Sequence, residues 1–215
     1  MKIQDLINLE TMTYNWDEID KIPLFQSLKE CKQNPKWHGE GDAYAHTRLV
    51  CQEAQNLVNS SERYKFRYKK RILLLMSALF HDIGKTTTTK IGKDNNWHSY
   101  GHELESERII REVLEINKNS LLDEICQLVR HHMEPLEIFK SKTFYEKLID
   151  LSNSVPSLEL LIDLKMCDVL GSHQENEDSK KSDLTKLESL IKISKHMSCY
   201  EYGFPDYKNE YKNGE

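Results

Sequence analysis

An apolar run that ends in two ionisable side chains constrains this 215-residue chain more than any other feature. Residues 72–80 read ILLLMSALF, and His81 and Asp82 follow directly. Such a run predicts a helix that is buried on most sides, and it is far shorter than the about 20 residues that cross a bilayer. Burying a histidine beside a carboxylate costs free energy unless partners or a metal compensate it. The rest of the chain must therefore supply groups that meet His81 and Asp82.

Composition places the chain among globular proteins, with 38% hydrophobic and 30% charged residues. The net charge of -5 argues against broad electrostatic binding to nucleic acid. The N-terminus carries no apolar segment of the kind that signal peptides have, and the five cysteines form no CxxC pair. We expect a cytoplasmic protein with reduced thiols, no membrane association and no evident protein partner.

Hydrophobic spacing predicts an all-α chain, without internal repeats or strand patterns. We expect one helical domain over residues 21–199, an N-terminal lead over residues 1–20 and a tyrosine-rich tail over residues 200–215. Loops are expected at residues 86–98 and 171–181. The expected helices cover about residues 22–33, 42–59, 71–84, 101–117, 121–133, 140–151, 156–170 and 184–197.

Several histidines and aspartates share the apolar faces of these helices. His46 lies four residues before Val50, and Asp168 lies on a stripe with Leu164. In residues 121–133 the spacing of apolar residues turns His132 inward and its neighbour, His131, toward a more polar side. The residues that we expect at inner positions are His46, His81, Asp82, His102, His132 and Asp168.

A metal centre explains this set better than a polar core does. A single inward histidine is usually a hydrogen-bonded core residue, but six such groups would demand many internal hydrogen bonds. Mixed imidazole and carboxylate ligands suit Mn, Fe, Co, Ni or Zn better than Mg or Ca. Six ligands exceed what one catalytic ion with an open position needs. We therefore expect two divalent ions, with Asp82 between them.

The same residues resemble a known signature. His46, the pair His81–Asp82 and Asp168 are similar to the H…HD…D pattern of the HD superfamily of metal-dependent phosphohydrolases, and HDIGK at 81–85 is typical of it. His102 and His132 match the extra histidines of its two-metal members. The resemblance implies an all-α fold and a phosphohydrolase.

A narrower resemblance covers about residues 21–175. HGEGDAYAHT at 38–47 is similar to the HPEGDxxxHT stretch in the HD domain of bacterial CCA-adding tRNA nucleotidyltransferases, and ALFHDIGK, YGHE and VRHH follow in the same order. Similar HD modules are fused to polynucleotide kinases. The resemblance implies 2′,3′-cyclic phosphodiesterase, 2′-nucleotidase or phosphatase chemistry on nucleotides or RNA ends. Because only 37 residues precede His38, we expect no nucleotidyltransferase activity.

Two other functions remain open at this point. Symmetrical diadenosine tetraphosphate hydrolases share the six-ligand pattern, although they typically carry an IRYHT stretch where this chain reads VRHHM. A non-catalytic nucleotide-binding module is the other alternative. The complete ligand set argues against it, since a degenerate HD domain would lose ligands.

The expected mechanism is in-line attack on phosphorus by a metal-activated hydroxide. Asp82 and Lys85 are the candidate catalytic residues, and Lys85 is also a candidate for binding phosphoryl oxygens. Arg130, His131 and His38 are the other candidate substrate-binding residues, with His131 placed to protonate the leaving oxygen. Each of these roles has a structural alternative. For Lys85 it is a solvated side chain, for Arg130 a structural contact, and for a histidine a place at the rim of the pocket.

Overall fold

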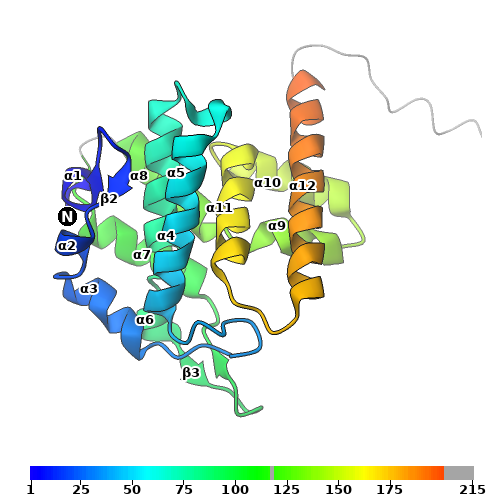
Figure 1. Ribbon diagram of the computed structural model, residues 1–215. Helices are drawn as coiled ribbons and strands as arrows, with labels where there is room; N and C mark the ends of the chain where they lie inside the picture. The colour runs from blue at the N-terminus through cyan, green and yellow to red at the C-terminus, as the bar shows by residue number, and fades with distance from the viewer. Residues whose placement is uncertain (117–118, 201–215) are drawn as a thin grey trace, which may run out of the picture.

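The computed structural model describes residues 1–116 and 119–200, and most of them are helical (Figure 1). Two short antiparallel strand pairs are the sheets of this described part, so the predicted all-α class is confirmed. The first half contains α1 (Ile3–Leu6), β1 (Ile7–Asn8), β2 (Thr13–Tyr14), α2 (Trp16–Ile19), α3 (Pro23–Gln26), η1 (Ser27–Glu30), α4 (Ala43–Ser60), η2 (Glu62–Tyr64), α5 (Tyr68–Phe80) and α6 (Lys85–Thr88). The second half contains β3 (Lys90–Ile91), β4 (Trp97–His98), α7 (His102–Val113), α8 (Asn119–Arg130), α9 (Glu134–Glu137), η3 (Ile138–Lys140), α10 (Phe144–Ser154), α11 (Leu158–Gly171) and α12 (Glu177–Tyr200).

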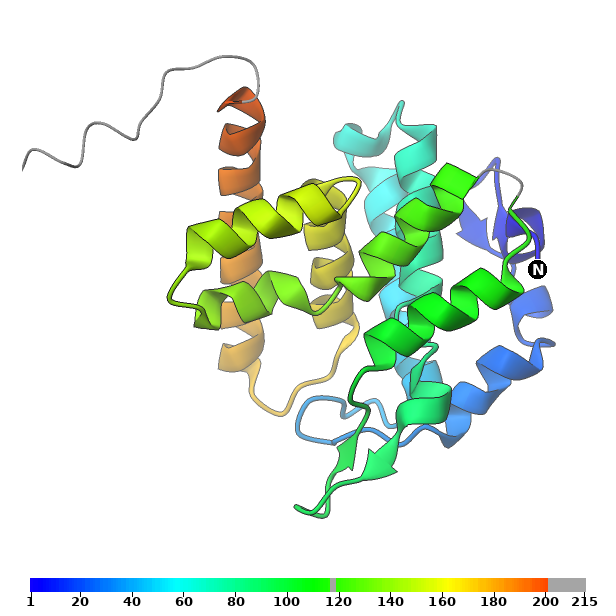
Figure 2. The ribbon, with the colours of Figure 1, turned by 180° about the vertical axis from the view of Figure 1, so that it is seen from behind.

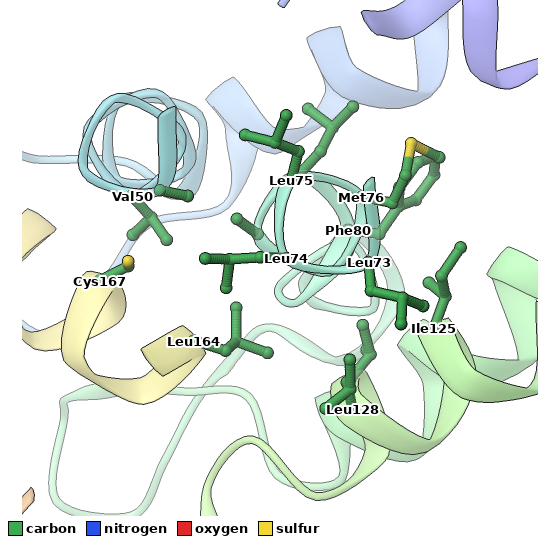
Figure 3. Close-up of a cluster of buried hydrophobic side chains, with 14 of the residues drawn as sticks. Val50, Leu73, Leu74, Leu75, Met76, Phe80, Ile125, Leu128, Leu164 and Cys167 are labelled. Atoms are coloured by element: carbon green, nitrogen blue, oxygen red, sulfur yellow. The ribbon is translucent and has the colours of Figure 1, made fainter. Parts of the chain in front are cut away.

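Helix α5 is the centre of the fold, as its apolar run predicts. Every residue from Ile72 to Phe80 is buried. Its side chains meet Val50 of α4 on one side and Leu128 of α8 and Leu164 of α11 on the others (Figure 3). Fully burying a leucine stabilises a fold by about 1.5–3 kcal/mol, so this helix fixes the positions of its neighbours.

Helices α4 and α11 pack against each other at close range. Asp42 caps α4, since its side chain accepts a hydrogen bond of 2.8 Å from the backbone N–H of Ala45. A Cβ atom added to Gly171 would lie 2.7 Å from the backbone nitrogen of Val50, so a glycine is needed where these helices approach. This contact brings the start of α4 near the end of α11.

A tight turn follows α5, where the sequence predicted a helix to about Gly84. The helix ends at Phe80, and residues 81–84 form the turn. A Cβ atom on Gly84 would lie 2.2 Å from the backbone oxygen of His102 and 2.6 Å from the nitrogen of Ser106, so α7 begins directly against the turn. Ser106 ties the two segments, because its hydroxyl accepts from Gly84 N–H and donates to the carbonyl of His81.

Two of the predicted loops are wrong in part. Within residues 86–98, β3 and β4 pair as a hairpin, with Lys90 opposite His98. Strands of two residues are too short to show an alternating pattern. Within residues 171–181, α12 begins at Glu177, because Asn176 accepts hydrogen bonds from the backbone of Asp178 and Ser179. The first turns of α12 are polar, so spacing of apolar residues does not mark them.

The segment assigned to the lead, residues 1–20, packs into the same core as the helices. Leu6, Ile7, Met12 and Ile19 are fully buried. The hydroxyl of Tyr14 donates to the carbonyl of Leu75 in α5 at 2.8 Å. Of the predicted tail, α12 includes Tyr200, and residues 201–215 lie outside the described residues. None of the helices in the described part has the length and apolar character that crossing a bilayer requires.

Candidate metal centre

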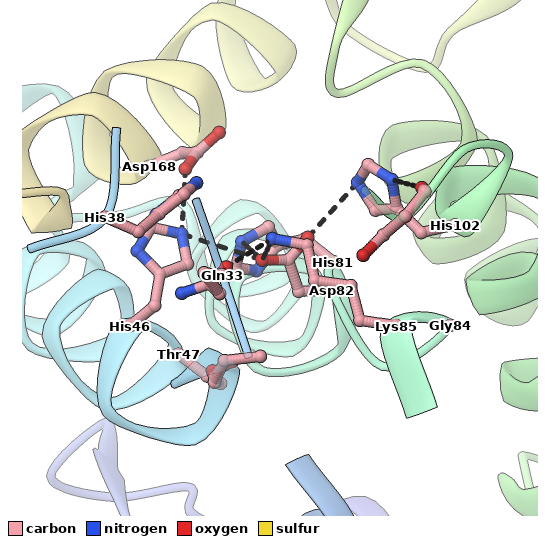
Figure 4. A network of polar contacts seen from close by, with 12 residues as sticks. Gln33, His38, His46, Thr47, His81, Asp82, Gly84, Lys85, His102 and Asp168 are labelled. Carbon is pink, nitrogen blue, oxygen red and sulfur yellow. Dashed lines mark hydrogen bonds and ion pairs between the residues drawn. The ribbon is translucent and has the colours of Figure 1, made fainter. Parts of the chain in front are cut away.

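Five segments bring the six predicted ligand residues to one buried region. Figure 2 shows the ribbon from behind, and Figure 4 shows His46, His81, Asp82, His102 and Asp168 at close range. Helix α4 provides His46, the turn after α5 provides His81 and Asp82, and α7 begins with His102. His132 follows α8, and Asp168 lies on α11. All six side chains are buried, so their polar atoms need partners inside the protein.

Asp82 stands between two groups of imidazoles. Its Oδ2 atom lies 3.3 Å from Nε2 of His81 and 3.6 Å from Nε2 of His46. Its Oδ1 atom lies 3.2 Å from Nε2 of His102, which in turn lies 3.3 Å from Nε2 of His132. Each group can offer three ligand atoms within 4.8 Å of one another. One carboxylate thus faces two candidate ion positions.

Asp168 joins the first group through His46. Its Oδ1 atom lies 3.0 Å from Nε2 of His46, the same ring nitrogen that faces Asp82. Its other oxygen, Oδ2, lies 2.7 Å from Nζ of Lys165, which is itself buried. The structure therefore brings together all six residues of the predicted ligand set.

Backbone carbonyls determine the tautomer of three of the histidines. Nδ1 of His81 lies 2.9 Å from the carbonyl oxygen of Ala78, and His102 and His132 make the same contact with the residues three positions before them, at 2.8 and 2.7 Å. A carbonyl only accepts, so each Nδ1 carries a proton, and in the neutral ring each Nε2 therefore presents a lone pair. This is the arrangement that metal-ligating histidines adopt.

In the neutral rings, the lone pairs on Nε2 of His81, His102 and His132 face other hydrogen-bond acceptors. Nε2 of His102 meets Nε2 of His132, and both His81 and His102 present Nε2 to the Asp82 carboxylate. Nε2 of His81 and Oδ2 of Asp82 are buried and lack a well-directed hydrogen bond. Contacts between acceptors are unfavourable unless a cation lies among them. The donor set therefore fits divalent ions with imidazole and carboxylate ligands.

His46 obtains its orientation from a residue that the sequence analysis did not single out. Oε1 of Glu40 lies 2.8 Å from Nδ1 of His46, at ion-pair distance but away from the ideal hydrogen-bond direction. The same oxygen lies 2.9 Å from Nδ1 of His38, and Oε2 accepts a hydrogen bond from the backbone N–H of His173. The only available signal for Glu40 was its place inside the HGEGD stretch.

The pKa values of these residues reflect how closely their charged groups lie to one another. Burial would raise the pKa of Asp82, but nearby His81 and Lys85 hold it well below its usual value. Burial would lower the pKa of His46, yet contacts with Asp168 and Glu40 raise it to about 9. The site thus holds its carboxylates ionised and attracts positive charge.

The same environment acts in the opposite direction on His132. Its burial, together with neighbouring His102 and His81, holds the pKa of His132 well below the usual range. A neutral imidazole is the form that binds metal. The second group therefore offers a neutral ligand at ordinary pH.

The candidate substrate-binding residues fall on two sides of the centre. On one side, Lys85 is buried and its Nζ lies 2.7 Å from Oδ2 of Asp82, and the partly buried His38 lies nearby. Lys85 and His38 line a pocket of about 200 Å³. On the other side, Arg130 and His131 line a wider pocket of about 460 Å³ together with His102.

In the wider pocket, Arg130 and His131 already have acidic partners. Arg130 is half exposed, and its Nη1 lies 2.8 Å from Oε2 of Glu107. Nδ1 of His131 lies 2.6 Å from Oε1 of Glu134. The structure does not bring these two residues into contact with Lys85.

Comparisons with known proteins agree with this geometry. The family model described as "HD domain" matches residues 43–193, which is more than half of the chain. Over 92 residues the chain is 35% identical to proteins named "Multifunctional CCA protein" from two strains of Actinobacillus pleuropneumoniae, serotype 5b (L20) and serotype 7 (AP76). The aligned stretch covers 43% of this chain but only 20% of the length of those relatives.

The matched region contains His46, the His81–Asp82 pair and Asp168, in the order that the HD signature requires. His102 and His132 lie between them and complete the second group. The chain belongs to the HD domain family, a superfamily of metal-dependent phosphohydrolases.

Proposed function

We propose that this chain hydrolyses phosphate esters of nucleotides or RNA ends, as a 2′,3′-cyclic phosphodiesterase, a 2′-nucleotidase or a phosphatase. The observation that carries the proposal is that His81 and His102, whose Nδ1 atoms contact backbone carbonyls, present Nε2 to Asp82 from both sides. The class of substrate is supported by the similarity to the multifunctional CCA proteins, which covers 43% of this chain. We expect hydrolysis and no addition of nucleotides, since the assembled residues provide ligands and cationic side chains for hydrolysis.

The ligand residues divide between two ions. We assign His46, His81, Asp82 and Asp168 to one ion, and Asp82, His102 and His132 to the other. Mn, Fe, Co, Ni or Zn fits this donor set. When bound, such ions lower the pKa of water toward neutrality and offset the charge of a phosphoryl group.

Lys85 is assigned to the phosphoryl group. An ammonium has three N–H donors. Nζ of Lys85 donates to Oε1 of Gln33 at 2.7 Å and forms an ion pair with Oδ2 of Asp82, also at 2.7 Å. The remaining donor is available to a non-bridging oxygen beside the metal centre. The fixed geometry means that little reorganisation is needed when the substrate binds.

His131 is assigned to the departing group. It lines the wider pocket next to His102, and its Nδ1 pairs with Glu134. This contact orients the ring, to which we assign the transfer of a proton to the leaving oxygen. We assign Arg130 to a second phosphate or to the ribose side of the substrate in the same pocket.

A second candidate function has one observation in its favour. The centre has a pocket on each side, one lined by Lys85 and the other by His131, so a substrate with two nucleoside halves could extend in both directions. Hydrolysis of diadenosine polyphosphates is therefore the alternative, and a substrate panel distinguishes it from action on RNA ends or mononucleotides.

The test is hydrolysis of bis-p-nitrophenyl phosphate and p-nitrophenyl phosphate with Mn or Ni added, followed by nucleoside 2′,3′-cyclic phosphates, 2′-, 3′- and 5′-nucleotides and diadenosine polyphosphates. We expect turnover that Asp82→Asn abolishes. The matched control is Asp150→Asn, an exposed aspartate on α10, which should retain activity. A metal-loaded chain that turns over none of these substrates would contradict the proposal and favour a nucleotide-binding module.

A further inference from the structure

One residue that lines the smaller pocket beside the centre carries an unpaired hydrogen-bond donor. This pocket of about 200 Å³ is lined in part by Gln33, Trp37, His38, Lys85 and Trp97. The side chain of Gln33 is nearly buried, and its Nε2 atom has no hydrogen-bond partner. Buried amide groups seldom remain unpaired in a folded protein. The donor therefore marks a position for a ligand acceptor.

Lys85 determines which end of the Gln33 amide is free. Nζ of Lys85 donates to Oε1 of Gln33 at 2.7 Å (Figure 4). Rotating the amide by a half-turn would direct its NH₂ group at the ammonium, and both are donors. The orientation that leaves Nε2 free is thus the favourable one.

Two indole rings line the same pocket. Trp37 lies in the loop before α4 and is 42% exposed, an unusual exposure for so large an apolar group. Nζ of Lys36 lies 5.0 Å from the centre of the Trp37 ring. Trp97 reaches the pocket from strand β4. Aromatic side chains of this kind stack with the faces of nucleobases.

The pocket connects directly to the metal centre through one side chain. Nζ of Lys85 lies 2.7 Å from Gln33 Oε1 and 2.7 Å from Asp82 Oδ2. A flat ring next to Gln33 is therefore separated from the centre only by the ammonium that we assign to the phosphoryl group. This spacing suits a nucleotide, with a base in the pocket and a phosphate at the centre.

We propose that this pocket is the nucleobase subsite, and that Nε2 of Gln33 donates a hydrogen bond to an acceptor on the base. The proposal rests on the proposed function for the position of the phosphate, but the recognition of the base does not require catalysis. Gln33 is thus a specificity-determining residue, and the indoles of Trp37 and Trp97 supply the stacking surfaces.

The experiment measures binding of free nucleosides, which carry no phosphate. Adenosine, guanosine, cytidine and uridine are titrated separately into the Trp16→Phe chain, and tryptophan emission is recorded. Trp16 packs against Tyr14 and Arg48 in a different region, so this background leaves only the two pocket indoles as emitters. We expect saturable quenching by at least one nucleoside.

Gln33→Glu tests the donor in the same background. Glutamate keeps an oxygen for Lys85 and replaces the free N–H donor by an acceptor, so the dissociation constant should rise about tenfold for the nucleoside that binds best. Gln52→Glu makes the same chemical change at an exposed position of α4 and should leave the dissociation constant within about twofold. Gln33→Met, also without the donor, repeats the test if the glutamate variant fails to fold.

The outcomes separate the two proposals. Lack of saturable quenching by any nucleoside, or equal affinities for the Gln33 and Gln52 variants, would overturn the subsite even if phosphate esters are hydrolysed. Nucleoside binding that depends on Gln33, in a chain that hydrolyses no phosphate ester, would support the subsite and contradict the proposed function.

Discussion

Glu40 contacts His46 on the side opposite to the ring nitrogen that faces Asp82 and Asp168. Oε1 of Glu40 lies 2.8 Å from Nδ1 of His46, and Nε2 of the same ring lies 3.0 Å from Asp168. Glu40 is itself held by the backbone N–H of His173, which joins the loop before α4 to the connection after α11. A carboxylate behind a ligating histidine fixes its ring and raises its basicity.

Glu40→Gln should weaken metal binding, because the amide is uncharged and supports the imidazole less well. We expect an increase of about 10- to 100-fold in the dissociation constant of the ion that His46 binds. Competition with a metal-sensitive dye measures it. Glu188→Gln, an exposed change on α12, is the matched control. Equal affinities in the two variants would show that Glu40 does not support the site.

Elemental analysis of the purified chain tests the division of ligands. About two transition-metal ions per chain are expected from the two groups around Asp82, and His102→Ala and His132→Ala should each lower the content toward about one. His196→Ala changes an exposed histidine on α12 and should retain both ions. A content of one ion that neither ligand variant changes would remove His102 and His132 from the ligand set.

Metal ions should also stabilise the folded chain, because they separate lone pairs that otherwise face one another. Saturation at about 100 times the dissociation constant adds about 2.7 kcal/mol, which raises the melting temperature of a chain of this size by about 5–10 °C. Differential scanning fluorimetry with Mn or Ni, reversed by a chelator, measures this shift. Asp82→Asn should lose most of it and Asp150→Asn should keep it, whereas equal shifts would place the ions elsewhere.

A buried aspartate outside the predicted ligand set gives a pH-dependent prediction. Burial raises the pKa of Asp163 to about 6, although contacts with Tyr64 and Arg63 oppose the change. The folded chain then holds this proton to a higher pH than the unfolded chain, so its stabilisation is present at low pH and is lost as the pH rises through about 6.

Relative to Asp163→Asn, the wild-type chain should gain roughly 1.4 kcal/mol of unfolding free energy between pH 7 and about pH 5. Urea unfolding of both proteins at several pH values measures this difference. Taking the difference between the two unfolding free energies removes the contributions of all other titratable groups. A difference in stability that stays constant with pH would mean that Asp163 is already ionised at pH 5.

Regular spacing in the sequence was sufficient for the parts of the centre that lie on helices or directly after them. It favoured His132 over His131, and the structure buries His132 almost completely while His131 lies at a pocket. Glu40 and Gln33 lie in irregular chain between η1 and α4, where apolar spacing gives no information about direction. Their partners, His46 and Lys85, lie far along the chain, and only the folded structure shows these contacts.

Lys85 illustrates a different limit. Its position after a glycine is compatible with a solvated lysine or with a phosphate contact, and sequence does not distinguish them. The structure buries it because α6 folds back against α7 and η1, which places its ammonium between Gln33 and Asp82. Burial of a charge of this kind depends on packing between elements and therefore cannot be read from local pattern.

The carbonyl contacts of His81, His102 and His132 have a consequence for how such a centre can change during evolution. Each of these rings is oriented by a main-chain atom three residues earlier, and the main chain is present whatever side chains surround it. Three ligands are thus insulated from most substitutions nearby. His46 relies on a carboxylate from another segment, so drift in the loop before α4 would disturb this ligand first.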